Sequence, residues 1–225
     1  MLIATWNVNS IRTRLSQIID WINKANPDII CLQETKVMDN SFPVEPFEKL
    51  GYSVEIYGQK SYNGVAIVSK IKAKKVEKGF CGFTDSDQNI EIFKDQKRLI
   101  SAEINGIKII NVYVPNGSSL ESNKFGYKID WLNCLASFLD QQEKKGEIIC
   151  LMGDFNVAPS SLDIHDPKKY EGGIMASEIE RNALDNVLKE RLIDSFRLFE
   201  KNTGHWSWWD YRNNSFEFNK GWRID

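Results

Sequence analysis

Short apolar runs, each closed by polar or turn-forming residues, recur along the chain and predict β-strands. Runs of four to eight residues rich in Ile and Val are typical of buried strands. Seven such strands are expected: Leu2–Trp6, Ile29–Gln33, Tyr52–Tyr57, Val65–Ser69, Arg98–Ile104, Ile107–Val114 and Ile148–Met152. A further segment, Lys70 to Gly79, alternates apolar residues with lysines, which favours a solvated edge strand over a basic binding surface.

Apolar residues at helical spacing separate some of these runs. The stretch from Ser10 to Lys24 places Ile11, Leu15, Ile18, Ile19 and Ile22 on one face. A second helix is expected from Phe125 to Leu139, with Gly146 available to end it. A third begins with the capping box Ser177-x-x-Glu180 and is expected to turn Ile179, Ala183, Val187 and Leu188 inward.

The order of these elements indicates an α/β protein whose sheets are mixed or antiparallel. Between Tyr52 and Val114 the strands follow one another without helices, which favours hairpins over a purely parallel sheet. We find no repeat, low-complexity segment or linker. Residues 1–225 are therefore expected to form a single domain with a substantial core.

Composition narrows the class of protein. The chain has 31 acidic and 29 basic residues, for a net charge of −2, so the overall balance does not favour a nucleic-acid binder. The start MLIATWN predicts no signal peptide, and no apolar run approaches the length of a membrane helix. Of the four cysteines, Cys31 and Cys150 lie inside apolar runs, where reduced thiols are expected. A cytoplasmic protein with no membrane partner fits these features.

Polar groups follow several predicted strands directly. Residues 148–159 read IICLMGDFNVAP, so Asp154 and Asn156 follow an apolar run. Taken alone, this pattern is that of an ordinary turn, in which Asp and Asn cap the backbone. However, Asn7 follows the first strand, and Glu34 follows the second. Strand ends on one rim of a sheet can bring their side chains together, so the four groups favour a site over coincidental caps.

The residue types limit the chemistry of such a site. Glu34, Asp154, Asn7 and Asn156 offer oxygen atoms, which suit a hard cation such as Mg²⁺. The two histidines, His165 and His205, lie in no His/Cys cluster, so zinc is not expected, and there is no nucleophile elbow for a serine triad. Metal-assisted hydrolysis of a phosphate ester remains.

A set of motifs then resembles a known family. TWNVNSIR, LQETK, GVAIVS, NVYVPNG, GDFNVAP followed by LDIHDP, WSWWDYR and GWRID occur in this order from residue 1 to residue 225. Together they are similar to the exonuclease III type of abasic-site endonucleases, in the endonuclease/exonuclease/phosphatase superfamily. The resemblance implies a four-layered α/β sandwich of two packed mixed sheets flanked by helices. It also implies Mg²⁺-dependent cleavage of DNA, with Mn²⁺ as a possible substitute.

Roles for individual residues follow from the same resemblance. Glu34 would be the principal metal ligand, supported by Asn7. Asp154 would align and deprotonate the attacking water, and it and Asn156 are also expected near the metal. Asn156 would hold the phosphate or the nucleophile. Tyr113 would contact the scissile phosphate or assist the leaving group, with Asn116 nearby. Asp225 would orient a catalytic histidine.

An aromatic pocket for a flipped-out abasic sugar is also implied. Its apolar wall would come from Trp208, Trp222 and Ile224, although a tryptophan in this stretch can equally fill a core. Arg98 and Arg212 are candidates for phosphate contacts, with surface or structural pairing as the alternative. The expected partner is duplex DNA with abasic sites or 3′ ends. The protein is expected to be a monomer in a bacterial-type cytoplasm and to act on DNA of the nucleoid.

The sequence departs from the family pattern at its end. Family members continue past the WRID motif to a Ser-Asp-His-x-Pro motif, which supplies an aspartate and the essential histidine. The printed chain stops at Asp225. The expectation is therefore a domain truncated at the C-terminus, lacking strands, and an enzyme that is inactive in this length.

Two other functions remain open at this stage. One is a phosphatase or phosphodiesterase of the same superfamily, acting on inositol phosphates or sphingolipids, against which WSWWDYR and GWRID argue. The other is a non-catalytic DNA-binding or interaction module. The balance of exonuclease and endonuclease activity and the number of metals are also open.

Overall fold

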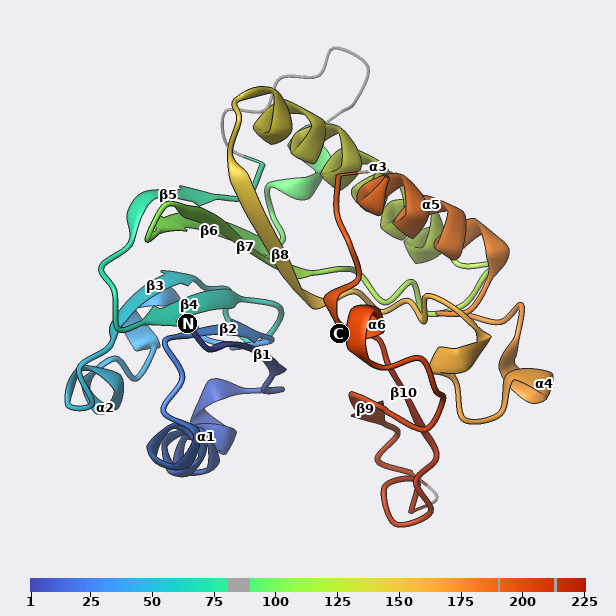
Figure 1. Ribbon diagram of the computed structural model, residues 1–225, viewed down its shortest axis with the longest axis horizontal. Helices are drawn as coiled ribbons and strands as arrows, with labels where there is room; N and C mark the ends of the chain where they lie inside the picture. Colours follow the sequence, from blue (N-terminus) through green and yellow to red (C-terminus); the bar gives the residue numbers. More distant parts are fainter. Residues whose placement is uncertain (81–89, 190, 213) are drawn as a thin grey trace. The chain divides into compact units, whose positions relative to one another are not determined.

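A computed structural model describes residues 1–80, 90–189, 191–212 and 214–225. Figure 1 follows the chain through these residues from β1 to β10. The chain forms two compact units. Unit 1 comprises Met1–Tyr113 and Gln141–Asp154, and unit 2 comprises Val114–Asp140 and Phe155–Asp225. Cys81 lies outside the described residues, whereas Cys31 and Cys150 are free thiols.

Unit 1 contains two mixed four-stranded sheets (Figure 1). The first sheet has the order β1-β2-β4-β3, and the second has the order β5-β6-β7-β8. In each, one pair is parallel, β1 with β2 and β7 with β8, while the other neighbours are antiparallel. The strands are β1 (Ile3–Asn7), β2 (Ile29–Gln33), β3 (Ser53–Tyr57), β4 (Val65–Ser69), β5 (Lys74–Lys78), β6 (Leu99–Ile104), β7 (Ile107–Tyr113) and β8 (Ile148–Asp154).

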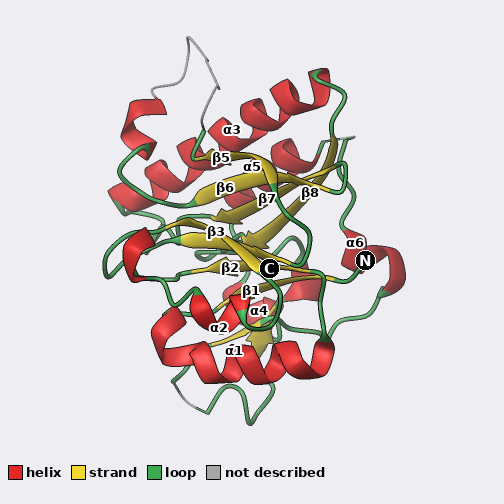
Figure 2. Cartoon of the chain, turned by 90° about the vertical axis from the view of Figure 1, so that its left-hand side faces the viewer, coloured by secondary structure: helices red, strands yellow, loops and turns green. Residues whose placement is uncertain are grey.

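The two sheets pack through a shared apolar core. Ile29, Cys31 and Ile67 from the first sheet meet Ile100 and Ile109 from the second, and all five are fully or almost fully buried. The outer side of the first sheet is covered by α1 (Ile11–Ala25) and α2 (Glu45–Glu48) (Figure 2). The prediction of an α/β fold with two packed mixed sheets and helices is therefore confirmed.

The sequence pattern located the strands of unit 1 closely. The predicted bounds of β2 and β4 are those observed, and Lys74–Lys78 is the exposed edge strand that its lysines predicted. The end of β8 differs, because the strand continues through Gly153 to Asp154. Asp154 is thus the last residue of a strand, paired in register with Tyr113 of β7, and does not lie in the following turn.

Helices and short segments make up unit 2. Its long helix α3 (Asn123–Lys144) includes the predicted stretch, and its last four residues belong to unit 1. The other elements are α4 (Pro167–Tyr170), α5 (Glu178–Leu188), α6 (Ser195–Phe199), β9 (Trp208–Trp209) and β10 (Gly221–Trp222). Three short 3₁₀ turns complete the described elements: Asp39–Ser41, Ile90–Phe93 and Ser161–Asp163.

The inward face of α5 differs from the prediction. Ser177 caps the helix, and the capping box with Glu180 is present as expected. However, the side chain of Ile179 is exposed, and the residue that turns inward beside it is Glu180, which is fully buried. The apolar pattern was misleading here because a buried carboxylate takes the position that an apolar residue would normally occupy. This carboxylate has a buried partner, described below.

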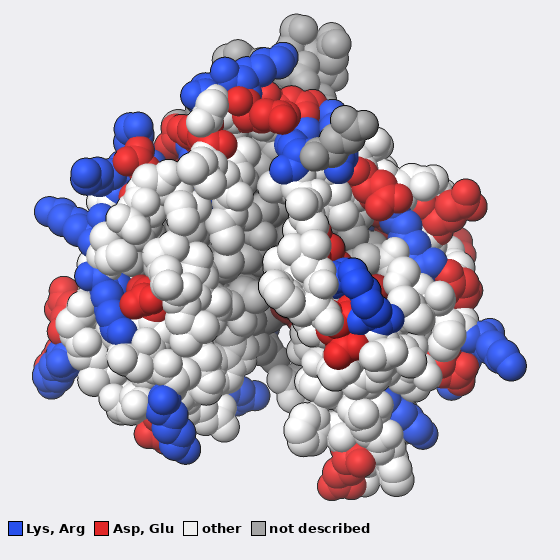
Figure 3. All heavy atoms as spheres, in the orientation of Figure 1, with Lys and Arg blue, Asp and Glu red and all other residues white. Residues whose placement is uncertain are grey.

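Charged side chains of both signs share the surface. On the face drawn in Figure 3, Lys and Arg side chains lie beside Asp and Glu side chains. This distribution agrees with the net charge of −2. Among the described residues, no helix combines the length and the apolar character that a bilayer-crossing segment requires.

Candidate active site

Three strand ends of unit 1 place Asn7, Glu34 and Asp154 together. In the parallel pair β1 and β2, Asn7 lies opposite Gln33, so Glu34 emerges directly beside it. The Nδ2 atom of Asn7 donates to Glu34 Oε1 at 2.8 Å and to Asp154 Oδ2 at 2.7 Å. One amide group therefore bridges the two carboxylates, which come from opposite sheets. We call these three residues the carboxylate cluster.

A backbone hydrogen bond fixes the orientation of the Asn7 amide. Its Oδ1 atom accepts a hydrogen bond of 3.0 Å from the backbone N–H of Asn9. The Nδ2 atom, which can only donate hydrogen bonds, consequently faces the carboxylates. In this arrangement Asn7 supports the carboxylates as a hydrogen-bond donor. Its direct contact with a metal through oxygen remains a prediction.

Glu34 has an unusual backbone conformation. Its φ of +52° lies in the left-handed region, which few residues other than Gly and Asn adopt. The carbonyl of Glu34 accepts from the N–H of Ser10, and the next N–H, that of Thr35, donates to the carbonyl of Gly64. Such strain costs about 1–3 kcal/mol, persists only where neighbours hold it, and is concentrated at functional sites.

The charge environment of Glu34 favours its ionised form. Burial raises the pKa of Glu34, but the hydrogen bond from Lys36, the hydrogen bond from Asn7 and the Lys36 charge outweigh it and leave this pKa below its usual value. Lys36 Nζ lies 2.8 Å from Glu34 Oε2. Sequence reasoning did not assign a role to Lys36, although the LQETK motif contains it. The carboxylate is therefore available as an anionic ligand at neutral pH.

Tyr113, at the end of β7, adds a phenol to this cluster. It is hydrogen-bonded to Glu34, and burial together with the Glu34 charge raises the pKa of Tyr113 well above its usual value. The phenol consequently remains a donor across the physiological range. The guanidinium of Arg98 lies 4.5 Å from the ring centroid and donates to the Tyr113 carbonyl at 3.1 Å. Arg98 thus has the structural pairing that was its alternative, and a phosphate contact remains a prediction.

A glycine makes the position of Asp154 possible. Gly153 has a φ of +143°, and a Cβ atom there would lie 1.9 Å from the carbonyl oxygen of Val112. Any larger residue would push β8 away from β7. The closeness of the two strands brings Asp154 opposite Tyr113, and Asp154 is almost fully buried.

In unit 2, the two predicted asparagines are joined to each other. Asn116 Nδ2 donates to Asn156 Oδ1 at 2.9 Å, and Asn156 Nδ2 donates to the Val114 carbonyl at 3.0 Å. The Oδ1 atom of Asn116 accepts from the N–H of Ser118 at 3.2 Å. Asn156 has a φ of +51°, a conformation that asparagine tolerates better than most residues. We call Asn116 and Asn156 the asparagine pair.

The three residues predicted to line an aromatic wall also lie together in unit 2. Trp208 of β9 pairs with Trp222 of β10, and Trp222 and Ile224 are buried in one apolar cluster against which Trp208 packs. Tyr170 lies edge-on to Trp222, with ring centroids 5.4 Å apart. The structure therefore assembles the predicted residues, and their contact with a sugar remains a prediction.

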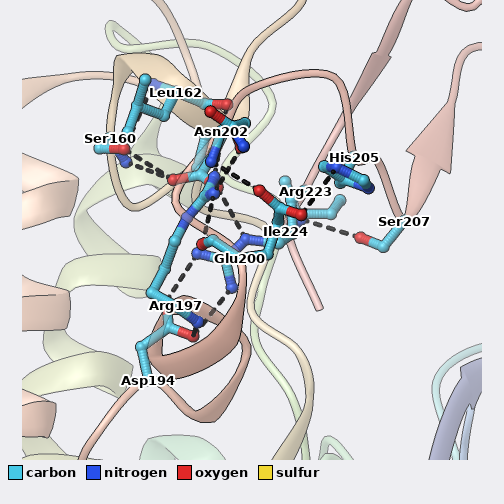
Figure 4. A network of polar contacts seen from close by, with 12 residues as sticks. Ser160, Leu162, Asp194, Arg197, Glu200, Asn202, His205, Ser207, Arg223 and Ile224 are labelled. Carbon is cyan, nitrogen blue, oxygen red and sulfur yellow. Dashed lines mark hydrogen bonds and ion pairs between the residues drawn. The ribbon is translucent and has the colours of Figure 1, made fainter.

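A polar network that the sequence did not predict fixes the segment carrying this wall (Figure 4). Arg223 Nε donates to Asp163 Oδ1 at 2.7 Å, and Arg223 Nη2 lies 2.6 Å from Asp194 Oδ2. Arg197 also pairs with Asp163. The N–H groups of Ile224 and Asp225 donate to Ser207 Oγ at 3.0 and 3.2 Å. The arginine of the GWRID motif, Arg223, could be recognised in the sequence, but its partners Asp163 and Asp194 could not.

Arg212 lies on the surface. It is paired with Asp210, at 2.9 Å between Nη2 and Oδ2, and its side chain is 83% exposed. Surface pairing was the alternative for this residue. A phosphate contact from Arg212, like the role of Asp225, remains a prediction.

The carboxylate cluster fits a hard cation. Within residues 1–80, 90–189, 191–212 and 214–225, no three His, Cys, Asp or Glu side chains gather into a complete cage for a metal. Mg²⁺ does not require such a cage, since it keeps several waters and uses one or two carboxylates together with substrate phosphates. Glu34 and Asp154 share one bridging amide, and a cation would reduce the repulsion between their charges.

Comparison with known proteins now identifies the family. The model of the Endonuclease/Exonuclease/phosphatase family matches residues 4–225. The chain belongs to this family. The exodeoxyribonuclease III of Haemophilus influenzae is 35% identical over 237 residues, covering 100% of this chain and 86% of that protein.

Solved structures agree with this assignment. An AP endonuclease from Archaeoglobus fulgidus has a TM-score of 0.91 and 40% identity, covering 100% of this chain and 85% of that one. A variant of the 3′ phosphatase NExo from Neisseria, bound to a product DNA hairpin, has a TM-score of 0.91 and 37% identity, covering 99% of this chain and 84% of that one. The predicted resemblance and the prediction of a hydrolase of this type are confirmed.

Proposed function

We propose that this protein is a DNA repair nuclease that uses Mg²⁺, or Mn²⁺ in its place, to hydrolyse phosphodiesters 5′ to abasic sites and from the 3′ ends of duplexes. The observation that carries the proposal is the bridging of Glu34 and Asp154 by the Asn7 amide, at three strand ends. The relatives named above add that similar chains act as nucleases and, in one case, bind a DNA product.

The proposed chemistry divides among residues of unit 1. Glu34, held ionised by Lys36 and Asn7, would be the main ligand of the cation. The cation would supply positive charge that stabilises the negative charge developing on the phosphoryl oxygens. Asp154 would orient the attacking water and accept its proton. The Tyr113 phenol would donate to a phosphate oxygen, because its raised pKa keeps it protonated.

Residues of unit 2 would bind the substrate. The asparagine pair offers amide groups for the phosphate or the nucleophile, and the wall of Trp208, Trp222 and Ile224 would face a sugar without a base. An abasic nucleotide needs little energy to leave the stack, which favours its selection by such a wall. Arg98 and Arg212 would add phosphate contacts, which contribute affinity without reading sequence.

A cleavage assay tests the proposal on the protein extended past Asp225 by a family-type Ser-Asp-His-x-Pro segment, since residues 1–225 alone are expected to be inactive. The substrate is a 5′-labelled duplex with one abasic site, and we expect a nick 5′ to that site in Mg²⁺ and no nick in excess EDTA. Asp154→Asn should lower the rate by roughly 10²–10⁴-fold, the usual contribution of a proton acceptor. Asp130→Asn, at an exposed position of α3, is the matched control and should leave the rate unchanged.

Two outcomes would contradict the proposal. Hydrolysis of an inositol polyphosphate without cleavage of the abasic duplex would identify a phosphatase of the same family. Binding of the duplex without cleavage in Mg²⁺ or Mn²⁺ would identify a non-catalytic DNA-binding protein.

A further inference from the structure

Unit 2 contains an ion pair that is completely buried. Lys128 of α3 and Glu180 of α5 contact each other through Nζ and Oε1, and both side chains have 0% exposure. Taking two charges out of water is costly, and their attraction offsets the cost only if the remaining hydrogen-bonding groups are satisfied. The partners of each charge therefore show what the pair does.

Two further contacts of Lys128 are with the candidate site. Its Nζ donates to the backbone carbonyl of Asn156 at 2.7 Å and to that of Asn116 at 3.2 Å. An ammonium group has three N–H donors, and Glu180 accepts the third. Lys128 thus binds the backbones of both members of the asparagine pair, whose side chains are bonded to each other.

Glu180 is held in place independently of Lys128. Its Oε1 accepts from the N–H of Met175 at 3.0 Å, and its Oε2 accepts from the N–H and the hydroxyl of Ser177 at 3.1 and 2.7 Å. The bonds with Ser177 belong to the capping box at the start of α5. The carboxylate is consequently a rigid anchor to which the lysine is attached.

The stem of Lys128 is also confined. A Cβ atom built on Gly117 would lie 3.2 Å from Lys128 Cδ, so the methylene chain passes directly beside the segment that follows Asn116. Buried ion pairs can often be replaced by apolar side chains without loss of stability. Stability alone therefore gives no reason for two charges at this position, whereas two directed hydrogen bonds from Lys128, which a third bond attaches to Glu180, hold the backbones of the two asparagines.

We infer that Lys128, anchored by Glu180, is a positioning residue that holds the backbones of Asn116 and Asn156 so that their side-chain amides present a fixed arrangement to the substrate. This inference rests on the proposed function, because it assumes that the asparagine pair binds the phosphate or the nucleophile. The lysine itself acts only through the asparagines.

A double variant separates positioning from folding. Lys128→Met alone would leave Glu180 buried without its partner and could unfold the protein. In Lys128→Met/Glu180→Gln both charges are removed, while the amide oxygen of the introduced glutamine can still accept from Ser177. We expect this variant to melt within a few degrees of the wild-type protein. Its kcat on the abasic duplex should fall by about 10- to 100-fold, since small misplacements of substrate-binding groups have effects of this size.

A second ion pair, formed by a buried lysine and a partly exposed glutamate, provides the control. Lys108 of β7 is buried, pairs with Glu77 and with Glu147, and donates to Gln142; all of these residues lie in unit 1. Lys108→Met/Glu77→Gln should leave kcat within about twofold of wild type. An equal loss of activity in both double variants would show that removal of any ion pair with a buried lysine has this effect, and would overturn the inference.

A readout independent of activity completes the test. In protein with ¹⁵N-labelled asparagine, the side-chain amide resonances of Asn116 and Asn156 should shift and exchange faster with solvent in Lys128→Met/Glu180→Gln. Those of Asn111, whose Nδ2 donates to the carbonyls of Leu32 and Ala66 in unit 1, should not change. Unchanged resonances of the pair, or a kcat within about twofold of wild type, would refute the positioning role. If the wild-type protein cleaves no DNA, the proposed function fails, and these resonances still decide whether Lys128 holds the asparagines.

Discussion

The amide of Asn7 illustrates how single residues define the carboxylate cluster. Its oxygen is occupied by the N–H of Asn9, and its nitrogen is shared between Glu34 and Asp154. An aspartate here would place a third negative charge beside two others, and an alanine would leave the two carboxylates without a common donor. The asparagine therefore supports two neighbouring anions in a geometry that a cation can use.

Asn7→Ala should weaken both metal binding and catalysis. Residues that orient metal ligands typically affect affinity or activity by about 10- to 100-fold, so we expect a loss of that size in the rate of abasic-site cleavage and a higher Mg²⁺ concentration for half-maximal rate. Cleavage rates measured over a Mg²⁺ titration test this. Asn186→Ala, at an exposed position of α5, is the control. A rate within about twofold of wild type at all Mg²⁺ concentrations would exclude the supporting role of Asn7.

At the scale of strands and helices, apolar patterning predicted most of unit 1 but not its details. The bounds of β2 and β4 follow from their apolar runs, because both faces of these strands are buried. The extension of β8 to Asp154 was not predictable, since it depends on the close approach of Gly153 to Val112. Likewise, Glu180 interrupts the apolar face of α5 because Lys128, 52 residues earlier, supplies its charge partner.

In the candidate site, too, the sequence predicted the positions of residues but not the contacts that depend on the fold. The positions of Asn7, Glu34 and Asp154 at strand ends were visible in the sequence, because strand ends coincide with the boundaries of apolar runs. Which atom of Asn7 faces the carboxylates was not, since that depends on the N–H of Asn9. The partners of Arg223 were hidden for the same reason: Asp163 and Asp194 are distant in sequence and resemble ordinary helix caps.

Gly153→Ala tests the close approach of β8 to β7. The added methyl would overlap the Val112 carbonyl, so the strands must separate, and overpacking of this kind typically costs about 1–3 kcal/mol, to which about 1 kcal/mol of backbone strain adds. Unfolding in urea measures this loss. Gly146→Ala is the control, because Gly146 also has a positive φ, of +73°, but a Cβ atom there meets nothing within 4 Å. Equal losses of stability in the two variants would show that the clash has no effect.

At the scale of the whole molecule, acidic and basic side chains nearly balance, and the net charge at pH 7 is −2. Figure 3 shows charges of both signs on one face. Repulsion between like charges is therefore small at neutral pH. Buried carboxylates then determine how stability responds to acid. Asp163 is 1% exposed, and its oxygens accept hydrogen bonds from Ser160, Arg197 and Arg223. Burial raises the pKa of Asp163, but the hydrogen bonds and the Arg223 charge outweigh it, so this pKa is lowered in the folded protein.

The sign of the resulting pH dependence follows from this lowered pKa. In the unfolded chain an aspartate takes up its proton at about pH 3.9. Above that pH the carboxylate is ionised in both states, and its contacts contribute fully to stability. As the pH falls below about 4, the unfolded state binds the proton first, and the contribution is lost progressively until the pH has passed below the folded pKa of Asp163.

Asp163→Asn should therefore remove an acid-sensitive part of the stability of the whole protein. At pH 7 the variant leaves a buried arginine without one of its two anionic partners, which typically costs about 3–5 kcal/mol. As the pH falls below about 4, the unfolded wild type binds its proton before the folded state does, so the difference in the free energy of unfolding should shrink progressively, and it should disappear only below the lowered folded pKa of Asp163. Urea unfolding followed by tryptophan fluorescence between about pH 3 and pH 8 measures this difference, with Asp130→Asn as the exposed control. A difference that stayed constant over the whole range would mean that the Asp163 carboxylate is not the acid-sensitive group, and that the arginines around it are held by other contacts.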